Sequence, residues 1–392
     1  MQPSPSPELP VPDAASAAHS ERCRAHLLRL IEQKGGSIGF AEFMHEALYA
    51  PGLGYYAAGA TKFGAAGDFT TAPEVSPLFG RVVATQCADV LRRPGHGRVL
   101  ELGAGSGRLA AALLGKLAEL DGIPEFYDIL EVSADLRERQ QRLLTEQVPG
   151  LADRVRWLDR LPDDFRGVII GNEVLDALPV ERFRMADELL ELRVTADEGR
   201  FAWCEAPASP RLCDAAAAIE DRLGGALARP YDSEYSPGLA PFVEDLVGAT
   251  RSGLVLLFDY GTSTRDYYAP ERDGGWLRCH FRHRAHDDPL VLPGIQDITT
   301  WVDFSAVAAA AHAAGAQIAG YVTQAHFLLA GGIADEVAGV AADGRRQVEL
   351  ANQVKMLTLP GEMGERFKCL ALSINGIPAP TALTLMDRTH TL

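Results

Sequence analysis

A short apolar run followed by three alternating glycines is the feature that most constrains this chain. Residues 98–109 read Arg-Val-Leu-Glu-Leu-Gly-Ala-Gly-Ser-Gly-Arg-Leu. The apolar run predicts a strand, Gly103, Gly105 and Gly107 predict a tight turn, and the Ala- and Leu-rich stretch that follows predicts a helix. Glycines let the backbone approach a ligand that a Cβ would block. We therefore expect a strand–turn–helix unit that holds a ligand at its turn.

The spacing of these glycines helps to identify the ligand. A dinucleotide fingerprint is G-x-G-x-x-G. Counted from Gly103, its third glycine position is Arg108, and counted from Gly105 it is Ala110, so only a looser form survives. The pattern E-x-G-x-G-x-G, beginning at Glu101, instead resembles motif I of class I S-adenosylmethionine (SAM) methyltransferases. A glycine-rich turn that binds no ligand remains the alternative.

Length and composition limit the classes of protein to consider. The 392 residues exceed the ~250–300 at which single cores stop growing, so we expect one large domain with insertions, or two lobes. A formal net charge of −16 argues against non-specific binding of nucleic acid. No apolar run is long enough to predict a membrane span. Six cysteines without a C-x-x-C pair fit a reducing compartment.

The first twenty residues are rich in Pro, Ser and Ala and have neither a basic nor an apolar targeting region. We expect residues 1–20 to be disordered and the protein to be cytoplasmic and bacterial.

Beyond them the pattern predicts an α/β protein. Residues 21–95 are expected to form an N-terminal lobe of helices and loops, and residues 96–392 a Rossmann-like sheet with helices on both faces. Expected strands are 99–102, 127–132, 155–158, 168–172 and 254–259, with a terminal strand pair at 317–329 and 367–373. Residues 181–250 interrupt the alternation as an insertion with a hairpin around Asp197-Glu198-Gly199.

Polar residues follow the expected strands at the edge where a ligand crevice forms in such sheets. Glu131, after the second strand, is placed to bind ribose hydroxyls, although a network that caps the next helix is the alternative. The fourth strand ends in Gly171-Asn172-Glu173, and Asp176 follows. This run places an amide and two carboxylates at the mouth of the crevice.

At this point the chain resembles the MidA family of SAM-dependent methyltransferases, whose mitochondrial members are protein arginine methyltransferases that assist complex I assembly. The resemblance covers about residues 38–370. Ala104 stands where the family often has proline, and Trp276 where threonine is expected. The matching stretches lie at residues 47–56, 63–69, 71–80, 101–103, 131–133, 171–179, 259–261, 283–288, 296–304 and 363–368.

The resemblance and the residues together indicate a SAM-dependent methyltransferase that acts on arginine of a partner protein. A protonated guanidinium needs carboxylates that orient it and offset its charge. Glu173 and Asp176 are the expected pair, on one face of a helical turn, although Asp176 has the alternative of a helix N-cap. Glu74 is a third catalytic candidate, with Asp68 and Asp259 in reserve.

The expected cofactor is SAM, with S-adenosylhomocysteine as its product. Tyr55 and the neighbouring Tyr56 have the equal alternative of packing the N-terminal lobe. The expected SAM-binding residues are Glu101, Gly103, Ala104, Gly105, Gly107, Glu131, Val132, Asn172, Tyr55, Thr71 and Pro73.

Several alternatives stay open. His280, His283 and His286 suggest a metal, but their spacing differs from that of known metal helices and we expect no metal site. The partner is expected to be a protein, with a respiratory-complex subunit as one candidate, and neither a nucleic acid nor a membrane; a homodimer is possible. Competing functions are a small-molecule SAM methyltransferase, a SAM-binding assembly protein without turnover and, less favoured, an NAD-dependent oxidoreductase.

Overall fold

The computed structural model describes residues 9–57, 71–340 and 344–392. These residues form two compact units. Unit 1 draws on residues 9–57, 176–239 and 262–303. Unit 2 draws on residues 71–175, 240–261, 304–340 and 344–392. Each unit therefore combines segments that are far apart in the sequence.

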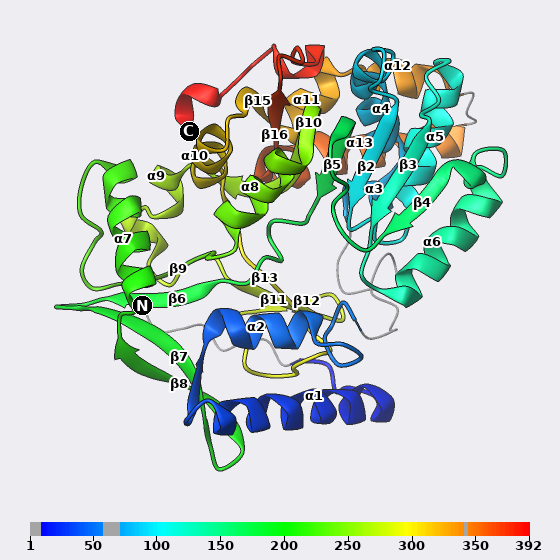
Figure 1. The fold of residues 1–392 in the computed structure, drawn as a ribbon. Helices are drawn as coiled ribbons and strands as arrows, with labels where there is room; N and C mark the ends of the chain where they lie inside the picture. Colours follow the sequence, from blue (N-terminus) through cyan, green and yellow to red (C-terminus); the bar gives the residue numbers. More distant parts are fainter. Residues whose placement is uncertain (1–8, 58–70, 341–343) are drawn as a thin grey trace. The chain divides into compact units, whose positions relative to one another are not determined.

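Unit 2 is built on a mixed sheet with the strand order β15-β16-β10-β5-β2-β3-β4 (Figure 1). The strands from β10 to β4 run parallel, whereas β16 is antiparallel to both β10 and β15. Their bounds are β2 Arg98–Leu102, β3 Phe126–Leu130, β4 Val155–Leu158, β5 Phe165–Asn172, β10 Thr250–Thr262, β15 Gln317–Thr323 and β16 Phe367–Ile374. The central strand β5 has the continuous apolar run Val168-Ile169-Ile170, fully buried, as expected for a parallel strand covered on both faces.

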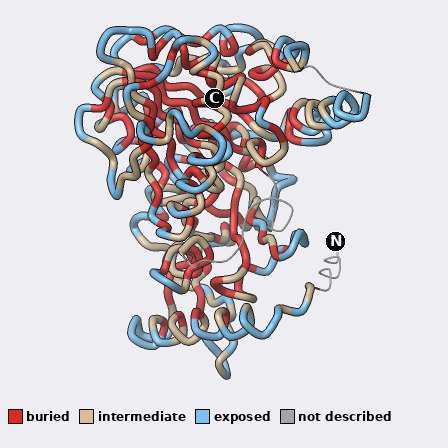
Figure 2. The backbone as a smooth tube through the Cα atoms, turned by 90° about the vertical axis from the view of Figure 1, so that its right-hand side faces the viewer, coloured by how far each residue is buried: buried red, intermediate tan, exposed pale blue. Residues whose placement is uncertain are grey.

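Helices pack on this sheet and close its core. The aromatic rings of Phe79 on α4, Phe258 on β10 and Phe327 on α11 meet edge to face at 5.1 and 5.0 Å. Figure 2 shows buried backbone concentrated inside and exposed backbone at outer turns. The helices are α3 Ala72–Val75, α4 Pro77–Leu91, α5 Arg108–Glu119, α6 Ala134–Gln147, α8 Leu239–Ala249, α10 Phe304–Ala313, α11 Gln324–Ala330, α12 Ile333–Ala338, α13 Gly344–Thr358 and α14 Met363–Arg366, with 3-10 turns at Ala152–Arg154, Thr381–Leu383 and Thr389–Thr391.

Unit 1 contains two smaller sheets and its own helices. The larger sheet has the order β1-β7-β6-β9, with β8 paired to β7, and the smaller has the order β12-β11-β13. The strands are β1 Ser37–Gly39, β6 Glu181–Met185, β7 Leu189–Asp197, β8 Arg200–Pro207, β9 Tyr231–Tyr235, β11 Arg278–Phe281, β12 Arg284–His286 and β13 Asp297–Thr299, and β14 is Val302–Asp303. The helices are α1 Ala14–Gln33, α2 Phe40–Tyr49, α7 Pro210–Leu223 and α9 Thr264–Tyr267, with a 3-10 turn at Pro270–Arg272.

The expected α/β fold with strands and helices in alternation is confirmed, and several boundaries differ. Helix α1 begins at Ala14, inside the segment expected to be disordered, because the Asp13 carboxylate accepts the N–H groups of Ala15 and Ser16. Residues 324–329 were expected to continue a strand but form α11, whose first turn is capped by Thr323. Residues 72–91, expected in the N-terminal lobe, lie in unit 2. The expected insertion 181–250 is divided, because residues 181–239 lie in unit 1 together with residues 262–303, whereas residues 240–250 lie in unit 2.

Within the described ranges, no helix combines the length and the apolar character needed to cross a bilayer.

Candidate active site

The glycine turn connects β2 to α5 in unit 2. Gly103, Gly105 and Gly107 all adopt left-handed φ angles, of 60°, 53° and 86°. The Gly103 N–H donates to the Leu130 carbonyl at 2.9 Å, and the Gly107 N–H donates to the Ala104 carbonyl at 2.8 Å. Ala104 is buried in the core between them. The predicted strand–turn–helix unit is confirmed.

Gln140 on α6 links this turn to the second strand end, and the sequence analysis missed it. Its fully buried side chain donates to the Gly105 carbonyl at 2.9 Å and to Glu131 Oε2 at 3.2 Å. Trp157 Nε1 donates to Gln140 Oε1 at 2.8 Å and fixes the orientation of the amide. The only sequence signal was a glutamine on the inner face of a polar helix, which is too weak to mark a site.

Glu131 lies just beyond β3 and is 6% exposed. Its Oε1 accepts the Ser133 N–H at 2.9 Å. Burial raises the pKa of this carboxyl, and its hydrogen bonds to Ser133 and Gln140 act in the opposite direction. Ser133 caps α6 with its own hydroxyl, so the helix does not need Glu131 as its cap. The next residue, Val132, a predicted SAM contact, has an apolar side chain that is 75% exposed.

Glu101 lies under the turn on β2, with 2% of its surface exposed. Tyr127 on β3 donates its hydroxyl to Glu101 Oε2 at 2.6 Å. Burial raises the pKa of Glu101 to about 7, while the Tyr127 hydrogen bond lowers it and the nearby charge of Glu131 raises it. Glu101 thus supports the turn from inside the sheet.

Glu74 on α3 is held by the glycine turn. Its carboxylate accepts from the Ser106 hydroxyl and pairs with Arg108 Nε at 3.0 Å. Thr71 and Pro73 are the N-cap and the first turn of the same short helix. Arg108, which breaks the dinucleotide fingerprint, therefore has a role in this fold as the partner of Glu74. This placement fits a residue that positions the turn.

The end of β5 carries Asn172 and Glu173. Asn172 donates to Glu173 Oε1 at 3.1 Å, and its own buried Oδ1 has no hydrogen-bond partner in the part of the chain that the structure describes. Glu173 has a left-handed φ of 55° and its N–H donates to the Phe258 carbonyl at 2.8 Å. A non-glycine residue in this region carries strain that often accompanies a functional site.

Asp259 on β10 holds the loop that follows Glu173. Its Oδ2 accepts the N–H groups of Val174 at 3.2 Å and Leu175 at 2.9 Å. The expectation that Glu173 and Asp176 share a helical turn is wrong. Glu173 has a left-handed φ angle, and the two N–H groups that follow it donate to the Asp259 carboxylate, so the backbone here is not helical. No helix begins directly after Asp176, since the next element of the described chain is strand β6, so its alternative as an N-cap is also wrong.

Asp176, Tyr55 and Tyr56 belong to unit 1. Asp176 is 4% exposed, and its carbonyl accepts the Thr300 N–H at 3.0 Å. Tyr55 is 3% exposed within the apolar core of unit 1, a placement that favours packing. Tyr56 is half-buried and donates its hydroxyl to Asp297 Oδ1 at 2.8 Å. The reserve candidate Asp68 lies outside the described residues.

The histidine run forms part of a hairpin. His280 on β11 and His286 on β12 flank a turn at Arg282 and His283, which both have positive φ. Burial lowers the pKa of His286. In the described ranges, no three His, Cys, Asp or Glu side chains are grouped to hold a metal ion. Trp276 packs against Trp301 with ring centroids 4.0 Å apart.

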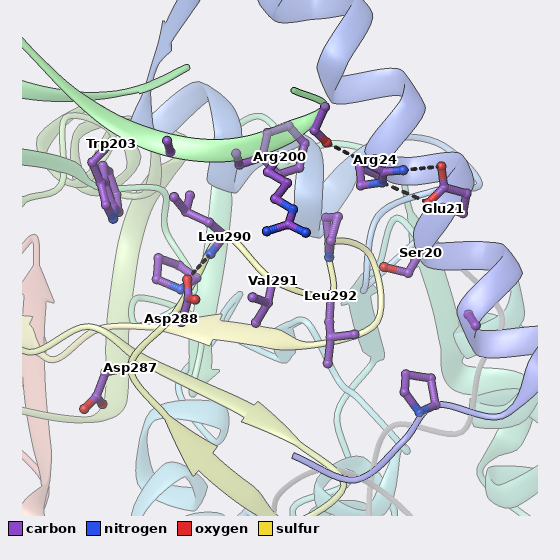
Figure 3. Close-up of a pocket in the computed structure, with 17 residues that line it drawn as sticks. Ser20, Glu21, Arg24, Arg200, Trp203, Asp287, Asp288, Leu290, Val291 and Leu292 are labelled. Atoms are coloured by element: carbon purple, nitrogen blue, oxygen red, sulfur yellow. Dashed lines mark hydrogen bonds and ion pairs between the residues drawn. The ribbon is translucent and has the colours of Figure 1, made fainter. Parts of the chain in front are cut away.

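A separate pocket of about 720 Å³ lies within unit 1, between α1, the β7–β8 hairpin and residues 287–293 (Figure 3). Arg24 donates to both carboxylate oxygens of Glu21 there, at 2.9 and 2.7 Å. Asp288 accepts the Leu290 N–H at 3.0 Å. The pocket shares no residue with the predicted site.

The unit 2 residues fit SAM on three observations. The left-handed turn allows close approach of a ligand, Glu131 offers a buried carboxylate for hydroxyls, and Asn172 Oδ1 is a buried acceptor available for a donor. Glu101 and Gln140 hold these groups in place from within the sheet and from α6.

Comparisons with known proteins indicate the same cofactor. Residues 81–322 match the family described as "Putative S-adenosyl-L-methionine-dependent methyltransferase". A Burkholderia thailandensis protein of the COG1565 superfamily, solved with S-adenosyl-homocysteine bound, is 43% identical with a TM-score of 0.93, covering 98% of this chain and all of that one. A native structure of a COG1565 protein from the same organism is 41% identical with a TM-score of 0.90, over the same shares of the two chains.

Curated relatives extend the match over most of the chain. The Drosophila melanogaster protein arginine methyltransferase NDUFAF7 homolog is 30% identical, over 92% of this chain and 87% of its own length. The Homo sapiens protein arginine methyltransferase NDUFAF7 is 29% identical, over 88% and 82%. The fold, the glycine turn with its acids, and these matches together show that the chain belongs to the MidA (COG1565) family of SAM-dependent methyltransferases.

Proposed function

We propose that this protein transfers the methyl group of SAM to an arginine side chain of a partner protein. The observation that carries the proposal is the position of Glu173. A strained carboxylate-bearing residue follows the central strand β5, in the same unit as the SAM turn, and Asp259 fixes the loop behind it. A strand end that only had to turn would favour glycine or asparagine there.

An arginine acceptor explains why acids are needed. Bound SAM would supply a methyl group carried by a positively charged sulfur. A nucleophile attacks the methyl carbon in line with the carbon–sulfur bond, and the sulfur is the leaving group. The guanidinium stays protonated, with a pKa of ~13.8, so its approach to that sulfur brings two like charges together. Carboxylates that bind two guanidinium nitrogens orient the group and leave the third nitrogen to react. We assign this role to Glu173 and to Asp176, three residues further along the chain.

The other predicted residues have supporting roles. Glu131 binds the ribose hydroxyls, and Gln140 keeps its carboxylate and the Gly105 carbonyl in register. Glu74 positions the turn through Ser106 and Arg108. Tyr55 acts through packing in unit 1 rather than through direct contact with SAM.

The relatives support arginine as the acceptor, because the curated proteins that match most of this chain carry the name protein arginine methyltransferase. A net charge of −16 suits a basic partner segment. A subunit of a respiratory complex is the first partner to test.

The test uses isotopically labelled SAM, with wild-type protein and Glu173→Gln added in parallel to a cell lysate. Mass spectrometry of proteins and metabolites then locates the label. The proposal expects labelled methylarginine in a protein, at least 100-fold less of it with Glu173→Gln, and equal binding of S-adenosylhomocysteine by both. Label in a small molecule, or no transfer by a protein that binds SAM, would overturn it in favour of the two competing functions.

A further inference from the structure

Unit 1 contains two buried aspartates beside two stacked tyrosines. Asp176 is 4% exposed and Asp297 is 1% exposed. Tyr49 and Tyr56 are half-buried, with ring centroids 5.5 Å apart and an angle of 25° between the rings. We name these four residues and Thr299 the aspartate–tyrosine cluster. All five belong to the same unit.

Contacts bring the members of the cluster together from three segments. The Tyr56 hydroxyl donates to Asp297 Oδ1 at 2.8 Å. The Tyr49 hydroxyl donates to the carbonyl of Ala177, the neighbour of Asp176, at 2.9 Å. The Thr300 N–H donates to the Asp176 carbonyl at 3.0 Å, which places the end of β13 beside Asp176.

The tyrosines report that both carboxylates act on one place. Burial raises the pKa of Tyr49 well above its usual value, and the charges of Asp176 and then Asp297 add to the increase. Burial is also the largest cause of the raised pKa of Tyr56, followed by Asp297. The contacts lead to the same place, since the two stacked tyrosines bond to Asp297 and to the residue next to Asp176.

Thr299 provides an independent sign of a ligand. It is 3% exposed, and its hydroxyl has no hydrogen-bond partner among the residues that the structure describes. In strand β13, Thr299 lies two residues after Asp297, so both side chains point to the same face. A buried hydroxyl without a partner costs stability, and a donor from a ligand removes that cost.

We propose that the aspartate–tyrosine cluster takes part in binding the guanidinium of the methyl acceptor, with Asp297 as a carboxylate in addition to Glu173 and Asp176. This inference rests on the proposed function and deepens it, because Asp297, Thr299 and the two tyrosines are new assignments. A guanidinium offers N–H donors in a planar fork, which matches two carboxylates and a hydroxyl. Its flat face stacks on aromatic rings such as Tyr49 and Tyr56, whereas a compact ammonium has no such face.

The test measures binding of guanidinium without requiring turnover. The probe is N-acetyl-arginine amide, observed by saturation-transfer NMR in the presence of S-adenosylhomocysteine. N-acetyl-citrulline amide is the neutral control of nearly the same shape, and N-acetyl-lysine amide tests the ammonium. The wild-type protein should bind the arginine probe at least 10-fold more tightly than either control probe.

Two variants and one matched control complete the experiment. Asp297→Asn, which keeps an acceptor for Tyr56, should weaken the arginine probe at least 10-fold. Thr299→Val should weaken it about 3- to 10-fold while the melting temperature stays the same or rises, which a merely structural threonine would not do. Asp197→Asn, an exposed acid on the β7–β8 hairpin, should bind the probe as the wild type does.

The outcomes separate this inference from the proposed function. The inference is overturned if the wild type does not bind the arginine probe, or if Asp297→Asn binds it equally well. It is also overturned if the lysine probe binds as tightly as arginine. Asp297-dependent binding without methylarginine in the lysate would retain the inference and reject the proposed function. If Asp297→Asn forms methylarginine with the same KM for the acceptor as the wild type, the proposed function is retained and the inference is rejected.

Discussion

Tyr127 and Glu101 form a buried hydrogen bond across neighbouring strands, with the tyrosine hydroxyl 2.6 Å from the carboxylate oxygen. Glu101 lies one residue before Leu102 and two before Gly103, so the bond lies close to the start of the glycine turn. It joins an acid of motif I to a side chain of the second strand. The strand that leads into the glycine turn and the strand that ends before Glu131 are therefore coupled inside the sheet.

This pair predicts an unusual pH dependence of stability. Because burial raises the pKa of Glu101 from 4.5 to about 7, the folded state holds its proton more tightly than the unfolded chain. The contribution of this proton to the free energy of unfolding is fully present below about pH 4.5 and is lost as the pH rises through about 7. Glu101→Gln, which stays neutral, should raise the urea midpoint at pH 8 and change it little at pH 4.5.

Urea unfolding of the wild type and the variant across this pH range measures the effect. Glu138→Gln, on the exposed face of α6, is the control and should leave the shape of the pH profile unchanged. Wild-type and Glu101→Gln profiles that stay parallel from pH 4.5 to 8 would contradict the assignment.

Glu74 should affect SAM binding more than the exposed ion pairs do. Glu74→Gln weakens the bond to Arg108 and removes the charge that Ser106 contacts, so the turn becomes less well ordered. We expect about 3- to 10-fold weaker binding of S-adenosylhomocysteine by calorimetry. Glu138→Gln breaks the exposed pair with Arg142 and should leave the dissociation constant unchanged. Equal affinity for Glu74→Gln and the wild type would show that the contact does not order the turn.

Gly107 should tolerate no side chain. Its φ is 86°, and a Cβ there would lie 3.3 Å from Gln140 Cα. Gly107→Ala should therefore destabilise the protein by about 1–3 kcal/mol and weaken S-adenosylhomocysteine binding at least 10-fold. Gly115→Ala, inside α5 where a Cβ meets no atom within 4 Å, should stabilise it by up to about 1 kcal/mol. Thermal unfolding and calorimetry compare the two, and equal effects would rule out the role given to the turn.

Local signals were enough to predict the elements around the SAM site. Residues 134–147 match the observed α6 because its serine cap is encoded within a few residues. Residues 155–158 match β4, a short segment in which Val155, Trp157 and Leu158 surround one arginine. The glycine spacing likewise predicted the tight turn, whose left-handed φ angles the structure then revealed. The sheet order follows from right-handed connections between such units.

Elements that depend on distant partners could not be predicted in the same way. Strand β9 reads Tyr-Asp-Ser-Glu-Tyr, a polar run with no strand pattern, and it forms by pairing with β6 about fifty residues earlier. Its Glu234 is fully buried and accepts the Trp276 N–H at 2.6 Å, a contact across 42 residues. The backbone at Glu173 was misjudged for the same reason, since Asp259 lies 86 residues away in the chain.

Asp259 should act as a positioning residue for Glu173. One carboxylate oxygen accepts the N–H groups of Val174 and Leu175, and the other accepts the Tyr260 N–H at 3.0 Å. Asp259→Asn has only one acceptor oxygen, so its amide group must face a backbone donor whichever way it turns. The loop would then shift and carry Glu173 with it, and we expect methyl transfer to slow about 10- to 100-fold.

The Asp259→Asn substitution should affect kcat far more than the binding of SAM. Because Asp259 bonds to the loop after Glu173, the KM for SAM should change less than 3-fold while kcat falls. The double variant with Glu173→Gln should be little slower than Glu173→Gln alone, since both changes remove the same function. Asp245→Asn, an exposed acid on α8, is the matched control and should keep wild-type kinetics. If the loss of activity in the double variant instead equals the product of the losses in the two single variants, Asp259 affects turnover by a route other than Glu173.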